Sequence, residues 1–145
     1  MTEISFYFNV ADRVDYACRL SRKAQRQGVG LAVAGPEEAL TAFDRRLWAF
    51  APAEFVPHAW SERQGEVPMR LHGGTVWLSR QALDAPRHDA LLNLGADVPG
   101  GFETFARVYE VVSTDDGDRA AARARWKAYA DRGYTIKRHE AGAAA

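Results

Sequence analysis

Positively charged side chains recur at a regular spacing near the C-terminus. Arg119, Arg123 and Lys127 are four residues apart, so on a helix they form one basic stripe, with Trp126 beside it. Cations next to a large apolar ring suit an acidic peptide that ends in an aromatic residue. They also suit single-stranded nucleic acid, through phosphate pairing and base stacking. The alternative without a binding function is a solvated helix face that covers a buried Trp126.

The charge of the whole chain makes this stripe informative. The 145 residues include 19 Lys or Arg and 19 Asp or Glu, so the formal net charge is zero. A neutral protein has no overall attraction for nucleic acid or anionic membranes, so a cationic site must come from local segregation. Residues 119–138 provide this segregation, with seven Lys or Arg and one acid.

A second group of residues suits protein binding rather than catalysis. Four aromatic residues fall within fourteen positions around two prolines, in Leu47-Trp48-Ala49-Phe50 and Phe55-Val56-Pro57-His58-Ala59-Trp60. Leu47 and Val56 are expected in the core. For Trp48, Phe55 and Trp60, two readings stay open, namely burial in the core and partial exposure at a protein interface.

The sequence shows no convergent catalytic or metal-binding set. The four histidines are far apart and form no metal-ligand spacing, namely His58, His72, His88 and His139. Cys18 lies among apolar neighbours in a helical pattern, which indicates a buried, inert thiol. Gly28 and Gly30 precede a strand, whereas a dinucleotide loop follows one. After the first strand stands Asp12 instead of a glycine loop, and its charge would repel a pyrophosphate. We expect no catalytic residue, metal or cofactor.

Strand-length apolar runs alternate with amphipathic helical segments. The expected strands are Ile4–Val10, Gly28–Ala34 and Arg107–Val112, and short strand candidates are Met69–Leu71 and Thr75–Leu78. Phe55–Trp60 is expected to be a short extended segment, and Ala90–Leu94 is a further apolar run. One helix is expected from the cap Asp12 to about Gln27, a second from Pro36 to about Ala49, and a third from the cap Asp118 to about Arg132. This alternation predicts a three-layer, Rossmann-like α/β fold: a mainly parallel sheet, helices on both faces and no functional nucleotide-binding loop.

The length and the hydrophobic pattern bound the domain organisation. We expect one domain over residues 1–138 and a disordered tail over 139–145. No stretch approaches the roughly 20 apolar residues of a membrane span, and the N-terminal apolar run is too short for a signal peptide. We therefore expect a cytoplasmic protein with no membrane partner, monomeric on its own.

Three motifs resemble one known family. They are an aromatic first strand around Phe6-Tyr7-Phe8, Leu47-Trp48 followed by Phe55-Val56-Pro57-His58, and Arg123-Ala124-Arg125-Trp126-Lys127-Ala128-Tyr129. In this order they are similar to the chi subunit family of bacterial DNA polymerase III. The similarity extends from about Phe6 to Tyr134 and is loose between Ser61 and Asp89.

The resemblance implies an adaptor without enzymatic activity. Members of that family have a Rossmann-like fold and bind the acidic, Phe-terminated C-terminal tail of the single-stranded-DNA-binding protein, which associates them indirectly with single-stranded DNA. They also bind the psi subunit, which links them to the clamp loader. Carried over by motif, tail binding falls on Arg119, Arg123, Trp126 and Lys127. Trp126 replaces the Tyr, and Arg119 the Lys, of the best-known members.

The same resemblance places the psi interface near Trp48, Phe55 and Pro57. One alternative from the residues alone remains open, in which the basic C-terminal helix binds single-stranded nucleic acid directly.

Overall fold

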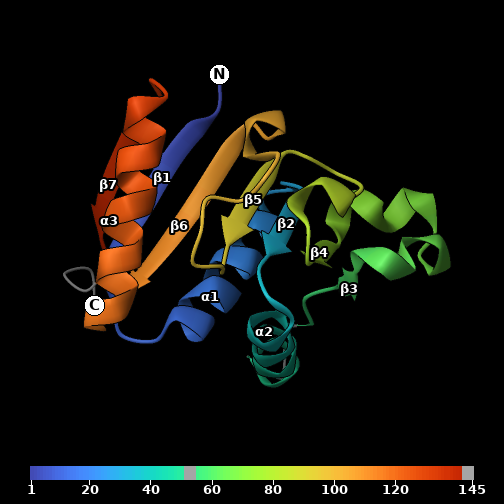
Figure 1. Cartoon of the computed structure of the whole chain (residues 1–145). Coiled ribbons are helices and arrows are strands. Elements are labelled where there is room, and N and C mark those ends of the chain that lie inside the picture. The colour runs from blue at the N-terminus through green and yellow to red at the C-terminus, as the bar shows by residue number, and fades with distance from the viewer. Residues whose placement is uncertain (51–54, 142–145) are drawn as a thin grey trace.

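The computed structural model describes residues 1–50 and 55–141, and within these residues seven strands form one sheet (Figure 1). The strand order is β3-β4-β2-β5-β6-β1-β7, and every neighbouring pair is parallel. The strands are β1 (Glu3–Val10), β2 (Leu31–Ala34), β3 (His58–Trp60), β4 (Val76–Ser79), β5 (Ala90–Asn93), β6 (Arg107–Ser113) and β7 (Ile136–Glu140). β2, β4 and β5 are buried at every position, which explains their nearly continuous apolar sequences.

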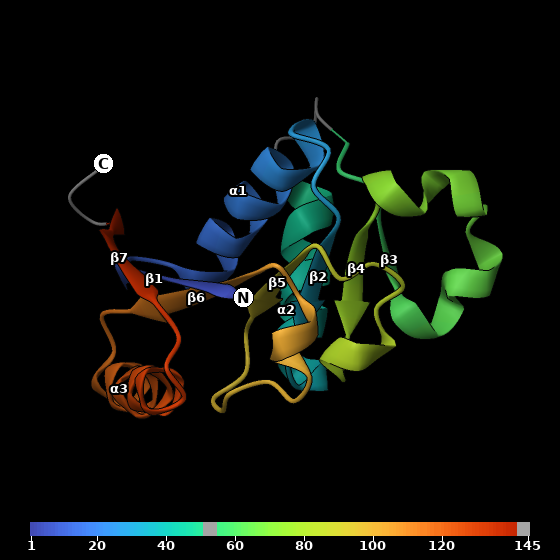
Figure 2. The same cartoon turned by 90° about the horizontal axis from the view of Figure 1, so that it is seen from above.

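Helices cover both faces of the sheet (Figure 2). α1 (Arg13–Arg26) and α2 (Glu37–Ala49) lie on one face, and α3 (Asp116–Asp131) lies on the other. Alternate residues of β2 separate the two layers, because Leu31 and Val33 join the core of α1 and α2, whereas Ala32 joins the core of α3. The three-layer, Rossmann-like fold predicted from the sequence is confirmed.

Short 3-10 segments replace longer helices in the connections. They are η1 (Ser61–Glu66), η2 (Met69–Gly74), η3 (Ala82–Asp84) and η4 (Phe102–Thr104). The prediction of a strand over Met69–Leu71 is wrong, because these residues begin η2 and Met69 is exposed. A strand of the predicted kind needs at least one face to bury, and this segment offers none.

α3 begins three residues earlier than the sequence pattern predicts. Asp118, the expected cap, lies inside the helix, and Asp115 is the cap, accepting a hydrogen bond from the Asp118 amide at 3.0 Å. The Asp118 carboxylate instead accepts from the Ser113 amide at 2.7 Å. Three acids within four residues all favour a helix start, so local chemistry alone does not choose among them.

The sequence pattern does not predict β7. This edge strand pairs in parallel with β1, with Ile136 opposite Ile4 and His139 opposite Tyr7. Residues 139 and 140, expected in a tail, therefore belong to the sheet, and residues 142–145 lie outside the described residues. The strand reads Ile-Lys-Arg-His-Glu and is exposed after its first residue, so it carries no apolar alternation.

The turn from β1 to α1 carries a carboxylate where dinucleotide-binding folds carry glycines. Asp12 caps α1 by accepting a hydrogen bond from the Asp15 amide at 3.1 Å, as the sequence predicts. It also pairs with Arg46 of α2 at 3.1 Å. A phosphate bound at this helix N-terminus would be repelled by the Asp12 carboxylate. This end of α1 is therefore suited to capping the helix and not to binding a phosphate.

Candidate functional site

A pocket opens between α3 and the β1–β7 edge of the sheet. It has a volume of about 470 Å³ and is lined by Phe8, Asn9, Arg119, Arg123, Trp126 and Arg138. These residues come from the end of β1, from α3 and from β7, which the parallel pairing brings together. Three of the four positions suggested for tail binding line this pocket.

Lys127, the fourth position, lies beside the pocket and not among its lining residues. Its ammonium group pairs with Asp131, one turn further along α3, at 2.9 Å. Both side chains are largely exposed, so this pair is weak and can open for another anion.

Aromatic rings form the apolar wall of the pocket. Trp126 is half-buried, with its ring centroid 5.1 Å from that of Phe6 and 6.0 Å from that of Phe8. The Arg138 guanidinium lies 4.4 Å from the centroid of the Phe8 ring, a cation–π contact. Trp126 therefore contributes one face to the core and another to the pocket, which combines the two interpretations of this residue from the sequence.

The three arginines of the pocket differ in how they are held. Arg119 donates a hydrogen bond to the Asn9 side-chain oxygen, and Arg138 donates two to Glu140, at 3.2 and 2.6 Å. Asn9 in turn donates to Glu140, and hydrogen bonds from Arg138 and Asn9 lower the pKa of that carboxyl. Within the described residues, Arg123 has no ion pair or hydrogen-bond partner, so its guanidinium is available to a ligand.

An irregular end of β1 brings Asn9 to the pocket. Asn9 has φ of 59°, in the left-handed region, and the pairing of β1 with β6 shifts register between Tyr7 and Val10. Asparagine enters this region more readily than most residues. Asn9, Phe8 and Arg138 are pocket residues that the sequence reasoning missed. An Asn directly at the end of a strand is the one local signal that could have drawn attention to the turn.

A buried polar network fixes the inner side of α3. Glu110 of β6 is fully buried and accepts hydrogen bonds from Arg125 at 2.9 Å, Asn93 at 3.0 Å and Tyr129 at 2.8 Å. Burial raises the pKa of Glu110, and Arg125 and the hydrogen-bond donors oppose that shift. Arg125 also donates to the carbonyl of Ala96 at 2.9 Å. These contacts fix the rotation of α3 and hence where Arg123 and Trp126 point.

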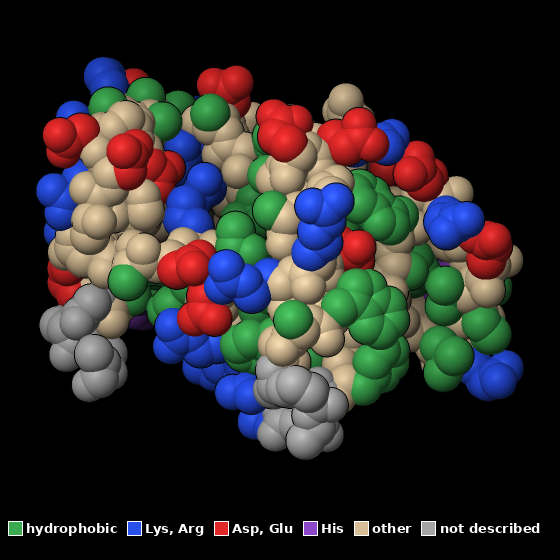
Figure 3. Space-filling view, turned by 90° about the horizontal axis from the view of Figure 1, so that it is seen from below, with side chains coloured by type: hydrophobic (Ala, Val, Ile, Leu, Met, Phe, Trp, Pro, Cys, Tyr) green, Lys and Arg blue, Asp and Glu red, His purple; other side chains and the backbone are tan. Residues whose placement is uncertain are grey.

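A second surface, formed by Trp48 and Phe55, exposes aromatic side chains beside α2. Their exposed fractions are 61% and 66%, and their ring centroids are 5.7 Å apart. His58 packs edge-on against Trp48 at 4.7 Å and pairs with Asp44 at 2.9 Å. Of the two interpretations left open by the sequence, the structure supports exposure for Trp48 and Phe55. Figure 3, viewed from the side to which the strands point, shows large hydrophobic side chains gathered on this face of the molecule.

The neighbours of Trp48 and Phe55 anchor this surface to the core. Leu47 and Val56 are buried, as predicted, whereas Pro57 and Trp60 are half-buried. Each exposed ring thus follows or precedes a core residue directly, which limits its freedom. An exposed apolar patch on a rigid base is typical of a protein-binding surface.

Cys18 and three of the four histidines have surroundings that suit a structural role and not a catalytic one. Burial raises the pKa of the Cys18 thiol to about 12, so the thiol is protonated at neutral pH. Three histidines bond to backbone carbonyls, namely His58 to Val56, His72 to Val67 and His88 to Ala85. Residues 1–50 and 55–141 contain no group of three or more His, Cys, Asp or Glu side chains that could hold a metal ion. Within the same ranges, no helix is long and apolar enough to span a membrane.

Fold and surfaces together define a class of protein. It is a doubly wound α/β domain with a carboxylate at its usual phosphate position and two surfaces suited to binding. Residues 1–137 match the family described as DNA polymerase III chi subunit, HolC, and the chain belongs to that family. The resemblance drawn from the sequence motifs is thereby confirmed.

Curated relatives support the same assignment. The chain is 33% identical over 144 residues to "DNA polymerase III subunit chi" of Pseudomonas aeruginosa, covering 96% of each chain. It is 30% identical over 129 residues to the protein of that name from Haemophilus influenzae, covering 88% of this chain and 87% of the relative. For Escherichia coli the values are 26% over 122 residues, with 82% and 79% coverage. The chain is thus related to subunits of the bacterial replicative polymerase along nearly its whole length.

Proposed function

We propose that this protein is a non-catalytic adaptor of DNA polymerase III that binds the acidic, Phe-terminated tail of the single-stranded-DNA-binding protein. The observation that carries the proposal is the pocket in which Arg119, Arg123 and Arg138 surround the wall of Trp126 and Phe8. Several cations around an aromatic wall match a chain end that has carboxylates and one terminal ring. The adaptor acts in the bacterial cytoplasm, at the replication fork.

In this proposal the terminal Phe ring packs on Trp126 and Phe8. Arg123, whose guanidinium has no partner among the described residues, takes the terminal carboxylate. Burial of a Phe side chain contributes roughly 1.5–3 kcal/mol. Exposed charge pairs add about 0.2–1 kcal/mol each, and bidentate arginine–carboxylate contacts lie at the upper end. After the cost of ordering the peptide, micromolar affinity is expected, about −8 kcal/mol. Lys127 reaches acidic residues further from the peptide end, once its pair with Asp131 opens.

The surface formed by Trp48, Phe55 and Pro57 serves as the docking surface for the psi subunit, which links the protein to the clamp loader. Support comes from two large exposed rings over buried neighbours and from family membership. This surface lies beside α2, whereas the pocket lies between α3 and the β1–β7 edge. Two partners bound to separate elements do not compete, as an adaptor requires.

Calorimetric titration with an acidic peptide that ends in Asp-Ile-Pro-Phe tests the tail-binding proposal. The same peptide without Phe should bind much more weakly, because it loses the ring contact. Arg123→Ala should weaken binding by roughly 1.5–3 kcal/mol, the range for hydrogen bonds to charged groups. Lys127→Ala, with the same charge change on the same helix, should weaken it less, because Lys127 lies outside the pocket lining.

Salt separates the two contributions. At about 1 M salt the screening length falls to about 3 Å, so the contribution of Arg123 should shrink while the dependence on the terminal Phe persists. If Arg123→Ala leaves peptide affinity unchanged but abolishes binding of naked DNA, the alternative of direct nucleic-acid binding by α3 replaces the adaptor proposal.

A further inference from the structure

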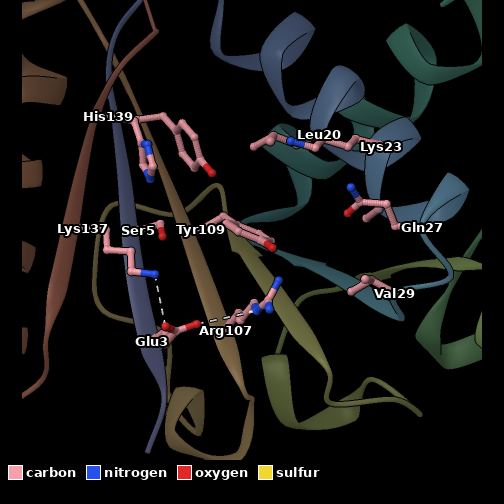
Figure 4. A pocket seen from close by; sticks show the side chains of 12 residues that line it. Glu3, Ser5, Leu20, Lys23, Gln27, Val29, Arg107, Tyr109, Lys137 and His139 are labelled. Atoms are coloured by element: carbon pink, nitrogen blue, oxygen red, sulfur yellow. Dashed lines mark ion pairs between the residues drawn. The ribbon is translucent and has the colours of Figure 1, made fainter.

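The sheet face opposite the tail pocket carries a second cleft. α3 covers one face of the β6-β1-β7 part of the sheet, and on the other face α1 lies beside a cleft of about 330 Å³ (Figures 2 and 4). Tyr7, Tyr109 and His139 line its floor, and Lys23 of α1 forms part of its wall. The floor is polar and aromatic, unlike the aliphatic floor under the rest of α1.

Strand alternation places different residues of β7 on the two faces. Lys137 and His139 line the cleft, whereas Arg138 between them lines the tail pocket. The same alternation in β1 sends Tyr7 to the cleft and Phe8 to the pocket. One edge of the sheet thus supplies cations and rings to both faces.

The cleft is cationic in a protein whose net charge is zero. Its lining includes Lys23, Arg107 and Lys137 and a single acid, Glu3, which leaves an excess of two positive charges. Figure 4 shows Arg107 and Lys137 both directed toward Glu3, at 3.7 and 3.3 Å. The ammonium group of Lys23, on the opposite wall, has no ion pair or hydrogen-bond partner within the described residues. The cleft therefore complements an anionic ligand.

Flat rings lie between these cations. Tyr7 and His139 stack with their centroids 4.5 Å apart and their planes 12° apart, and Tyr109 lies 6.2 Å from Tyr7. His139 is exposed, and both tyrosines are half-buried. Bases of single strands stack on such rings, and neighbouring cations neutralise the phosphates.

We propose that this open sheet face binds single-stranded nucleic acid, with Tyr7, Tyr109 and His139 as the stacking floor and Lys23, Arg107 and Lys137 as phosphate contacts. A second acidic peptide fits less well, because the cleft spreads its rings and cations apart instead of enclosing one side chain. The proposal is independent of the tail-binding function, since it uses the opposite face of the strands.

Fluorescence anisotropy with a labelled oligothymidylate and the full chain tests this proposal, at about 50 and about 200 mM salt. The double variant Lys23→Ala/Lys137→Ala should lower affinity at least about fivefold at the lower salt. It should also reduce the slope of log affinity against log salt by about 1.4, at about 0.7 per lost phosphate contact. His139→Ala should lower affinity as well, through lost stacking.

Matched controls separate this cleft from the tail pocket. Arg123→Ala/Lys127→Ala removes two positive charges from α3 on the opposite face and should leave DNA affinity nearly unchanged. Lys23→Ala/Lys137→Ala should leave binding of the acidic peptide unchanged. All changed side chains are exposed, so the variants should fold, which circular dichroism would verify.

Three outcomes overturn the proposal. The first is no DNA binding by the unmodified protein at the lower salt. The second is an equal loss in both double variants, which assigns DNA binding to overall charge or to α3. The third is loss of peptide binding with DNA binding intact in Lys23→Ala/Lys137→Ala, which makes the cleft a peptide site. The first two results do not bear on whether the terminal Phe is recognised in the other pocket, whereas the third would also contradict the tail-binding proposal.

Discussion

Arg123 and Arg125 lie two residues apart on α3 and have opposite environments. Arg123 is exposed at the pocket and has no ion pair within the described residues, whereas Arg125 is 2% exposed and bonds to Glu110. Two helical positions differ by about 200°, so one arginine faces outward when the other faces the sheet. The same residue type therefore serves ligand binding on one side of the helix and positioning on the other.

The inner contacts are a costly way to hold a helix. Desolvation of a buried ion pair offsets much of its attraction, and a well-packed apolar pair is often equally stable. The network is also incomplete, because one guanidinium nitrogen of Arg125, Nη2, has no hydrogen-bond partner within the described residues. Its directional hydrogen bonds fix the rotation of α3, which a purely apolar contact would fix less well. We infer that the outer pocket depends on this inner network for its geometry.

The largest effect is expected when the inner network is broken. Arg125→Ala leaves the fully buried Glu110 without its cation, which should lower the free energy of unfolding by about 3–5 kcal/mol. Urea denaturation followed by circular dichroism measures this change. Arg123→Ala, with the same charge change on the same helix, should stay within about 0.5 kcal/mol of the unmodified protein. Equal destabilisation by the two variants would remove the contrast between the two sides of α3.

Much of the fold follows from the sequence because the central strands and helices have strong patterns. β2 and β5 are apolar runs, and Asp12 caps α1 as expected. β7 escapes prediction because an exposed edge strand needs no apolar residues, and only its pairing with β1 makes it a strand. The start of α3 escapes because Asp115 and Asp118 are equally good local caps.

The sequence predicts only the part of the candidate site that lies on a single helix. Helical spacing places Arg119, Arg123 and Trp126 together, and all three line the pocket. Phe8 and Arg138 join them through strand pairing, which spacing within one segment does not reveal. Glu110 carries a weak signal, a carboxylate inside an apolar strand, but its three partners come from two other segments, β5 and α3.

An intermediate effect is expected when the network loses one hydrogen bond. Tyr129→Phe removes the bond of 2.8 Å from the Tyr129 hydroxyl to Glu110 but keeps the ring that packs on Phe6 and Phe102. The free energy of unfolding should fall by roughly 1.5–3 kcal/mol, since the acceptor is a charged group. Peptide affinity should change little if the folded helix keeps its rotation. A large loss of affinity without loss of stability would show that the inner side acts on the ligand directly.

The smallest effect is expected at the rim of the pocket. Glu140 accepts hydrogen bonds from Arg138 and Asn9, and Asn9 accepts one from Arg119, so one exposed carboxylate is linked to two pocket cations. An incoming peptide carboxylate must compete with Glu140 for Arg138. Glu140→Gln keeps the size of the side chain and removes its charge. It should therefore tighten binding of the acidic peptide by about a few fold at low salt.

The salt dependence of peptide binding and a distant control variant test whether Glu140 competes with the peptide for Arg138. The gain from Glu140→Gln should vanish at about 1 M salt, where the screening length is about 3 Å. Glu38→Gln, the same charge change on the exposed side of α2, should give no gain at any salt concentration. Weaker peptide binding in Glu140→Gln would reverse the interpretation. Glu140 would then hold Arg138 over the Phe8 ring in the position that the ligand needs, and the rim would position a cation as Glu110 does inside.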